Sequence, residues 1–313
     1  MTTTTAPAGR VRQRRGDRWF SGTALAAGVM ILVTLAAVAI FLVIQSIPGL
    51  TATGETASLL SGSFWEYVWP LAFGTVWASF LALLMAVPLA VAVALFISHY
   101  APRRLAQGLG YIVDLLAAVP SVVFGLWGIL VLAPAVQPVY AWLNAHMGWF
   151  PPFGGTVSST GRTIFTAAIV LAVMVVPIIT AICREIFLQT PVLHEEAALA
   201  LGATRWEMIR MAVFPFGRSG IVSASMLGLG RALGETMAVA MVLSATGVVT
   251  FRLFTSENPS TIPANIALTF PEAYGTNINV LIATGLILFI VTFAVNAIAR
   301  WIVSRRKEFS GAN

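Results

Sequence analysis

The chain has 313 residues, of which 58% are hydrophobic and only 10% are charged, and its mean hydropathy is +0.89. A soluble domain does not need that balance, whereas a protein that crosses a membrane several times does. The formal net charge of +6 is informative only through the positions of the charges, and the single Cys183 excludes internal disulfides and a cysteine-rich metal site. We expect no metal site.

The two ends of the chain differ from its apolar interior. Residues 1–18 are polar and arginine-rich, which predicts a disordered basic arm. The apolar run Ser21–Ile47 is too long for the core of a signal peptide and has no convincing cleavage site, so we expect a retained membrane anchor. Residues 19–303 are predicted to form one transmembrane domain, and residues 304–313 a short tail.

A helix that spans the bilayer needs ~20 consecutive apolar residues, because only helices and closed barrels satisfy their own backbone in lipid. Six segments qualify, so we predict an all-α membrane protein with six transmembrane helices. The predicted segments are Ser21–Ile47, Pro70–Ser98, Gly108–Ala133, Thr163–Cys183, Phe216–Ala245 and Ile278–Ile302. The loop after the third segment, Pro134–Arg162, is expected to contain a short amphipathic helix along the membrane surface.

Positive charges predict the orientation, since cytoplasmic loops carry an excess of lysine and arginine. Fifteen of the 18 such residues fall on one side of the predicted spans: Arg10, Arg12, Arg14, Arg15, Arg18, Arg103, Arg104, Arg184, Arg205, Arg210, Arg218, Arg300, Arg305, Arg306 and Lys307. Only Arg162 and Arg252 fall on the other side, and Arg231 lies inside a span. Both termini are therefore predicted to be cytoplasmic.

Several residues within or beside the spans have structural interpretations. Pro88, Pro120 and Pro177 each interrupt a span and predict kinks. Asp114, near the cytoplasmic end of the third span, is interpreted as a snorkelling or capping residue rather than a substrate contact, and Arg184 as interfacial.

The cytoplasmic segment Thr190–Pro215 carries charges of both signs and signals for two helices joined by a tight turn. Thr190 is expected to cap the first helix and Gly202 to end it in a left-handed conformation. Thr204 and Glu207 predict a capping box at the start of the second helix, which Pro215 is expected to stop. A DNA-binding helix-turn-helix has the same outline, but the segment has few basic residues and apolar spans on both sides.

The fifth span contains two charged residues, Arg231 and Glu235, four positions apart and predicted to share one helix face. A charged residue at the bilayer centre costs roughly 2.5–3.5 kcal/mol on insertion scales, so Arg231 should face protein or water. One interpretation is a polar lining of an anion path, and the other is an ion pair that only holds helices together. The nearby glycines, from Gly228 to Gly234, do not match a nucleotide-binding loop and favour close helix packing.

The cytoplasmic segment resembles the EAA motif of ABC-importer permeases, in which E-A-A is followed by three residues, a glycine, nine residues and I-x-L-P. The matching residues are Glu196, Ala197, Ala198, Gly202 and Pro215, with Ala212 and Phe214 in place of the isoleucine and leucine. In that family the motif forms a coupling helix that docks on a cytoplasmic ATPase. The resemblance implies a type I importer permease with a MetI-like core.

Two further stretches, Ala118–Gly128 and Phe214–Thr236, resemble the PstC family of phosphate-importer permeases. That resemblance implies an inner-membrane subunit paired with a PstA-like permease, two PstB-like ATPases and a PstS-like binding protein. It also implies roles for Arg231 and Glu235 in phosphate passage. The chain has no Walker motif, so ATP would be used by the partner ATPase, and no cofactor is expected on this chain.

Two alternatives stay open at this point. The first is a permease for another oxyanion, such as sulfate or molybdate, which charge and spacing alone do not separate from phosphate. The second is a membrane scaffold or signalling subunit that moves no substrate, although such a subunit does not need charged residues within the fifth span.

Overall fold

The computed structural model describes residues 15–307, and these residues are mostly helical with no β-strand beyond isolated bridges. The long helices are α1 (Arg15–Leu50), α2 (Phe64–Leu95), α6 (Ile164–Leu188), α9 (Phe214–Leu233) and α12 (Thr276–Lys307). The shorter ones are α3 (Arg103–Ala117), α4 (Ser121–Trp127), α5 (Ala133–Met147), α7 (Val192–Ala200), α8 (Arg205–Met208), α10 (Met237–Val242) and α11 (Ile262–Thr269). Between them lie the π-helical turns η1 (Phe96–Tyr100), η2 (Gly128–Leu132) and η4 (Ile209–Val213) and the 3-10 turns η3 (Pro151–Phe153) and η5 (Phe270–Glu272).

Six helical stretches are long and apolar enough to cross a membrane, which confirms the predicted all-α class with six spans. They are Trp19–Leu50, Phe64–Tyr100, Ser121–Met147, Ile164–Leu188, Arg205–Leu233 and Thr276–Trp301. Most of the predicted basic arm (1–14) and part of the predicted tail (308–313) lie outside the described residues. The last residues of that arm, from Arg15, already belong to α1.

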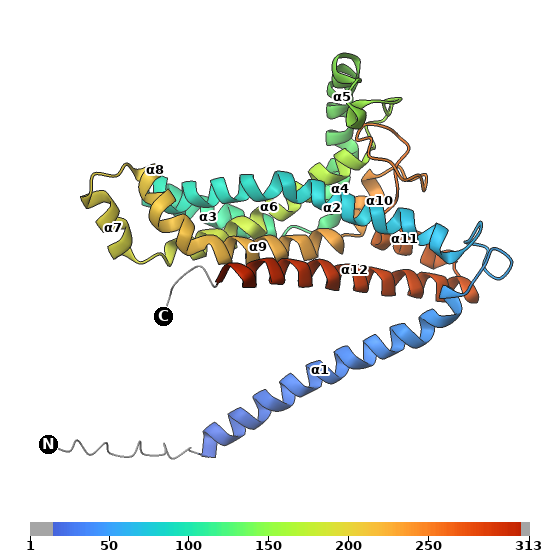
Figure 1. The fold of residues 1–313 in the computed structure, drawn as a ribbon, viewed down its shortest axis with the longest axis horizontal. Coiled ribbons are helices and arrows are strands. Elements are labelled where there is room, and N and C mark those ends of the chain that lie inside the picture. Colours follow the sequence, from blue (N-terminus) through green and yellow to red (C-terminus); the bar gives the residue numbers. More distant parts are fainter. Residues whose placement is uncertain (1–14, 308–313) are drawn as a thin grey trace.

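The third predicted segment has the wrong bounds. Pro120 does not kink a continuous helix there but separates α3 from α4, and the helix of membrane length is Ser121–Met147. The residue before a proline is disfavoured in the helical region, so the chain leaves the helix over 118–120. In Figure 1 the resulting α5 stands across the direction of the long helices. Pro88 and Pro177, by contrast, lie inside helices that continue past them.

The centre of the bundle is the contact between α2 and α6, which small residues on α2 make close. Five alanines at four-residue intervals are fully buried along one face of α2: Ala78, Ala82, Ala86, Ala90 and Ala94. Small side chains let helix backbones approach each other, and in a bilayer such packing is a main source of helix association. The Thr180 hydroxyl of α6 also donates to the Ala90 carbonyl at 3.3 Å. The α2–α6 pair is therefore the rigid frame of the domain.

Glycines bring α9 equally close to α6. A Cβ added at Gly228 would lie 2.7 Å from a methyl of Val175 and 2.8 Å from one of Ile179. At Gly217 it would lie 2.8 Å from the Phe187 ring. The packing interpretation of these glycines is confirmed for Gly228, whereas a Cβ at Gly230 would meet nothing within 4 Å.

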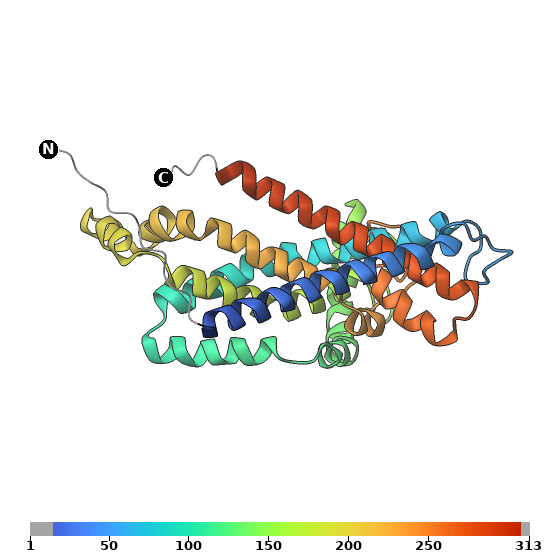
Figure 2. The same ribbon diagram turned by 90° about the horizontal axis from the view of Figure 1, so that it is seen from below.

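The ends of the bundle are distinct. Figure 1 shows α7 and α8 at one end, with the start of α1 and the end of α12 directed toward that same end. This arrangement agrees with termini on the side of the Thr190–Pro215 segment. Figure 2, turned by 90°, shows that the axes of the long helices are broadly aligned, although the chain runs back and forth along them. Near its C-terminal end α1 meets α12, where Asn279 donates to the Gln45 carbonyl at 2.9 Å.

Candidate functional site

The turn between α7 and α8 is built from two interlocking caps. Gly202 has φ of +86°, a left-handed conformation that glycine adopts without steric cost. Its N–H donates to the Leu199 carbonyl at 3.0 Å, and the next N–H, of Ala203, donates to the Ala198 carbonyl at 3.2 Å. This pair of bonds is the Schellman motif, which satisfies carbonyls that a helix end leaves free. The predicted role of Gly202 as the end of the helix is confirmed.

The capping box at the start of α8 is also confirmed. The Thr204 side chain accepts from the Glu207 backbone N–H at 3.3 Å, and the Glu207 carboxylate accepts from the Thr204 N–H at 2.7 Å. The cap directly follows the Schellman turn, so the direction of the chain between the two helices is fixed on both sides.

Two predicted helix boundaries are wrong. Pro191, not Thr190, occupies the capping position of α7, and the buried Thr190 hydroxyl has no hydrogen-bond partner among the described residues. Pro215 does not stop the second helix: it sits in the first turn of α9, and the chain is helical from Arg205 to Leu233. The π-helical turn η4 explains this, because Phe214 N–H bonds to the carbonyl of Ile209, five residues back. The backbone hydrogen bonds of the helix are therefore already shifted by one residue just before Pro215, which has no N–H to donate.

The three EAA residues of α7 differ in their exposure to solvent. Ala198 is buried, whereas Glu196 and Ala197 are exposed at the end of the bundle. Beside them, the side chains of Leu193 and Leu201 are 76% and 89% exposed. Large apolar side chains presented together with a carboxylate are typical of a surface that docks a partner.

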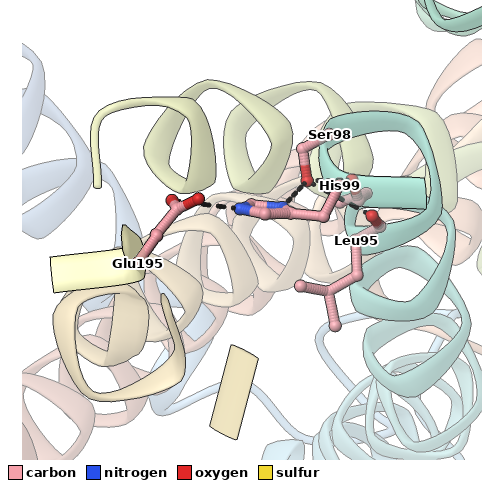
Figure 3. Close-up of polar contacts among 5 residues, drawn as sticks. Leu95, Ser98, His99 and Glu195 are labelled. Carbon is pink, nitrogen blue, oxygen red and sulfur yellow. Dashed lines mark hydrogen bonds and ion pairs between the residues drawn. The ribbon is translucent and has the colours of Figure 1, made fainter. Parts of the chain in front are cut away.

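Glu195, the neighbour of Glu196, was not singled out from the sequence but contacts a residue that is distant in the sequence. Its Oε1 lies 3.3 Å from Nε2 of His99 in η1, at the end of α2 (Figure 3). The two residues are 96 positions apart. Only the charge at 195 and the scarcity of histidine hinted at the pair.

Arg231 and Glu235 do not share a helix face, which corrects the sequence prediction. Helix α9 ends at Leu233, and Glu235 lies in the short break before α10. No ion pair joins Arg231 to Glu235, although both lie within the described part of the chain. The buried Glu235 carboxylate instead accepts from the Ala238 N–H at 3.1 Å and so caps the first turn of α10. Backbone donors, rather than an arginine, stabilise this carboxylate.

Arg231 faces a cavity of about 1040 Å³ between α6, α9 and α12. Its Nε is shielded from solvent and has no hydrogen-bond partner among the residues described. The lining residues include a second arginine and no carboxylate: they are Ile178, Ser223, Met226, Leu227, Gly230, Arg231, Phe293, Asn296, Ala297 and Arg300. A guanidinium that lines a cavity without a neighbouring carboxylate can donate to an oxyanion there.

Asp114 forms an ion pair with Arg184, Oδ2 to Nη2 at 3.6 Å, so its partner is a residue of α6. No group of three or more histidine, cysteine or acidic side chains suited to a metal ion is found within residues 15–307.

Residues 86–308 match the family described as the binding-protein-dependent transport system inner membrane component. The chain therefore belongs to this class of transport permeases. Among solved structures, the chain resembles one titled as a bacterial ABC transporter that imports alginate, with a TM-score of 0.60 and 17% identity over 92% of this chain and 97% of that one.

Curated relatives narrow the assignment. The chain is 49% identical to the phosphate transport system permease protein PstC 2 of Mycobacterium tuberculosis over 92% of this chain and 91% of the relative. It is 44% identical to PstC of Mycobacterium leprae over 97% and 98%. The chain belongs to the PstC family of inner-membrane permeases.

Proposed function

We propose that this chain is the permease subunit of an ATP-driven importer of inorganic phosphate and that it forms part of the translocation path. It would pair with a PstA-like permease, two PstB-like ATPases and a PstS-like binding protein. The observation that carries the proposal is Arg231, an arginine within the membrane domain that lines a cavity together with a second arginine and no carboxylate. The names of the PstC relatives support phosphate as the anion.

The helix that begins at Arg205 offers a mechanical connection between ATPase and substrate. It starts three residues after Gly202 and stays helical, through the π-helical turn η4, to Leu233, two residues beyond Arg231. A partner ATPase that closes on ATP would displace α7 and α8, and the continuous helix would carry that movement to the cavity. This chain would supply the path and the lever, while ATP would be hydrolysed by the partner.

Arg231 suits a transient anion site for chemical reasons. A guanidinium stays charged, and its planar fork matches two oxygens of a phosphate. A cavity open enough for the ion to leave keeps that binding from becoming a trap. Arg300 and Asn296 of α12 would supply further donors on the opposite wall.

The test is ATP-driven uptake of labelled phosphate by the complete complex in proteoliposomes, with binding protein present. Arg231→Gln should abolish uptake while the complex stays assembled, because the charge is lost and most of the side-chain volume remains. Arg218→Gln is the matched control, since Arg218 lies on the same helix but is exposed and outside the cavity lining. Sulfate or molybdate uptake in place of phosphate would overturn the substrate, and uptake of none of them would favour a scaffold or signalling subunit.

A further inference from the structure

His99 and Glu195 join the coupling segment to the C-terminal end of α2. The ring of His99 is largely enclosed, with 9% of its side chain exposed, and the Glu195 side chain is 22% exposed. Figure 3 shows the carboxylate, the imidazole and the Ser98 hydroxyl in one line between α7 and the end of α2. Among the described residues, this is the ion pair that ties α7 to a membrane helix.

Polar partners hold the His99 ring from both sides. The Ser98 hydroxyl lies 2.8 Å from the Ala94 carbonyl, which can only accept, so the serine proton points there. The Ser98 oxygen, 2.7 Å from Nδ1 of His99, is then left to accept from the ring. On the other side, Nε2 of the ring lies 3.3 Å from Oε1 of Glu195. The ring therefore bridges Ser98 and Glu195.

The adjacent glutamates of α7 have different surroundings. Glu196, which stands in the EAA register, is exposed and available to a partner, whereas Glu195 is turned toward His99. One helix turn therefore presents a carboxylate to the cytoplasm and another to the bundle. A force that a partner applies to α7 would therefore be transmitted to His99 through Glu195.

His99 lies where the regular α-helical hydrogen bonding of α2 ends. It belongs to η1, a π-helical turn between α2 and α3, and such turns occur frequently at functional sites. Beyond η1, α2 is packed along its alanine face against α6. In the N-terminal half of α2, Thr75 accepts from the Ile262 N–H at 2.9 Å and so holds the start of α11. A displacement of α2 would therefore be felt at the opposite end of the domain.

We propose that the His99–Glu195 pair is a second mechanical link, which carries the movement of α7 into α2 and keeps substrate movement coupled to ATP hydrolysis. It acts in parallel with the lever formed by the helix from Arg205 to Leu233. The proposal rests on the proposed transport function. His99 and Glu195 are positioning residues and do not contact the anion.

The experiment measures phosphate taken up per ATP hydrolysed by the complete complex in proteoliposomes, together with the amount of ATPase that co-purifies. His99→Gln and Glu195→Gln should each lower the ratio by roughly fivefold or more, in the range of ordinary coupling between sites, while the ATPase co-purifies in full amount. The reciprocal exchange, His99→Glu with Glu195→His, restores a contact between an imidazole and a carboxylate and should recover most of the ratio. Glu196→Gln is the matched control and should weaken ATPase co-purification instead.

An unchanged ratio in both single variants would overturn the link. A lowered ratio that the exchange fails to recover would also overturn it, because the two side chains would then act separately. If a single variant fails to assemble, the exchange variant decides: recovery supports the pair, and failure counts against it. Should the wild-type complex move a different anion, the proposed substrate fails, yet the ratio for that anion still tests the link.

Discussion

Asp114 of α3 and Arg184 of α6 form an ion pair across a glycine. Nη2 of Arg184 lies 3.6 Å from Oδ2 of Asp114, and the guanidinium passes over Gly110, where a Cβ would collide with it. The absence of a side chain at 110 is thus what allows the arginine to reach its partner. The pair fastens the amphipathic helix α3 to the rigid α2–α6 frame.

Filling the space at Gly110 should lower the free energy of unfolding more than removing the charge of Asp114. Asp114 is half exposed, so Asp114→Asn should lower the free energy of unfolding by at most about 1 kcal/mol. Gly110→Leu should cost more, because it displaces Arg184 and pushes α3 from α6. Thermal unfolding of the complex in detergent checks the order, and Gly108→Leu, on an open face of the same helix, is the control.

The turn at Gly202 should tolerate no β-branched residue. The left-handed conformation costs an ordinary residue about 1–2 kcal/mol, and valine more, so Gly202→Val should distort the angle between α7 and α8. Membrane insertion should survive, while ATPase co-purification and phosphate uptake fail. Ala203→Val, one residue further on, is the control. Normal uptake by Gly202→Val would contradict the docking role of the segment.

Two glycines of α9 should respond differently to the same change. A Cβ at Gly228 meets Val175 and Ile179, whereas a Cβ at Gly230 meets nothing within 4 Å. Gly228→Val should therefore destabilise the bundle by about 1–3 kcal/mol through overpacking. Gly230→Ala should leave its thermal stability unchanged. Equal stability of the two variants would show that α6 and α9 are not in tight contact.

A substitution at Glu235 should not restore the phosphate uptake that is lost when Arg231 is replaced. Since no ion pair joins them, Arg231→Gln strands no carboxylate, and adding Glu235→Gln should not restore uptake. Glu235→Gln alone should loosen the start of α10, because a neutral amide is a weaker acceptor for the Ala238 N–H. Uptake by the double variant, measured against wild type, checks this. Full uptake would leave Arg231 as a structural residue.

The orientation predicted from charge places both termini in the cytoplasm. A reporter that is active only in the cytoplasm, fused after Asn313, should be active. The same reporter inserted near Gly155, at the other end of the bundle, should be silent. The opposite pattern would show that every loop lies on the other side of the membrane from the one predicted.

Features encoded by a few neighbouring residues could be predicted from the sequence. The turn glycine at 202, the capping box at 204–207 and the packing role of Gly228 all depend on local chemistry or on side-chain size. Local reasoning failed where distant contacts or a shifted backbone ladder decide. Pro215 was expected to end a helix, but the π-helical turn before it removes the conflict.

The charged residues were harder to interpret for the same reason. Spacing suggested that Arg231 and Glu235 would pair, yet a break after Leu233 turns Glu235 toward the backbone of α10. Spacing offered no route to the pairing of His99 with Glu195, because only the folded bundle brings them together.

The contact between α1 and α12 has a consequence for biogenesis. Gly49 lies so close to the backbone at Asn279 that a side chain there would collide with it, and Asn279 also bonds to Gln45. Since α1 is synthesised before α12, it finds this neighbour only after α12 has been made. Until then α1 must persist in the bilayer without its contact to α12. Its almost wholly apolar surface makes it stable in lipid during that time.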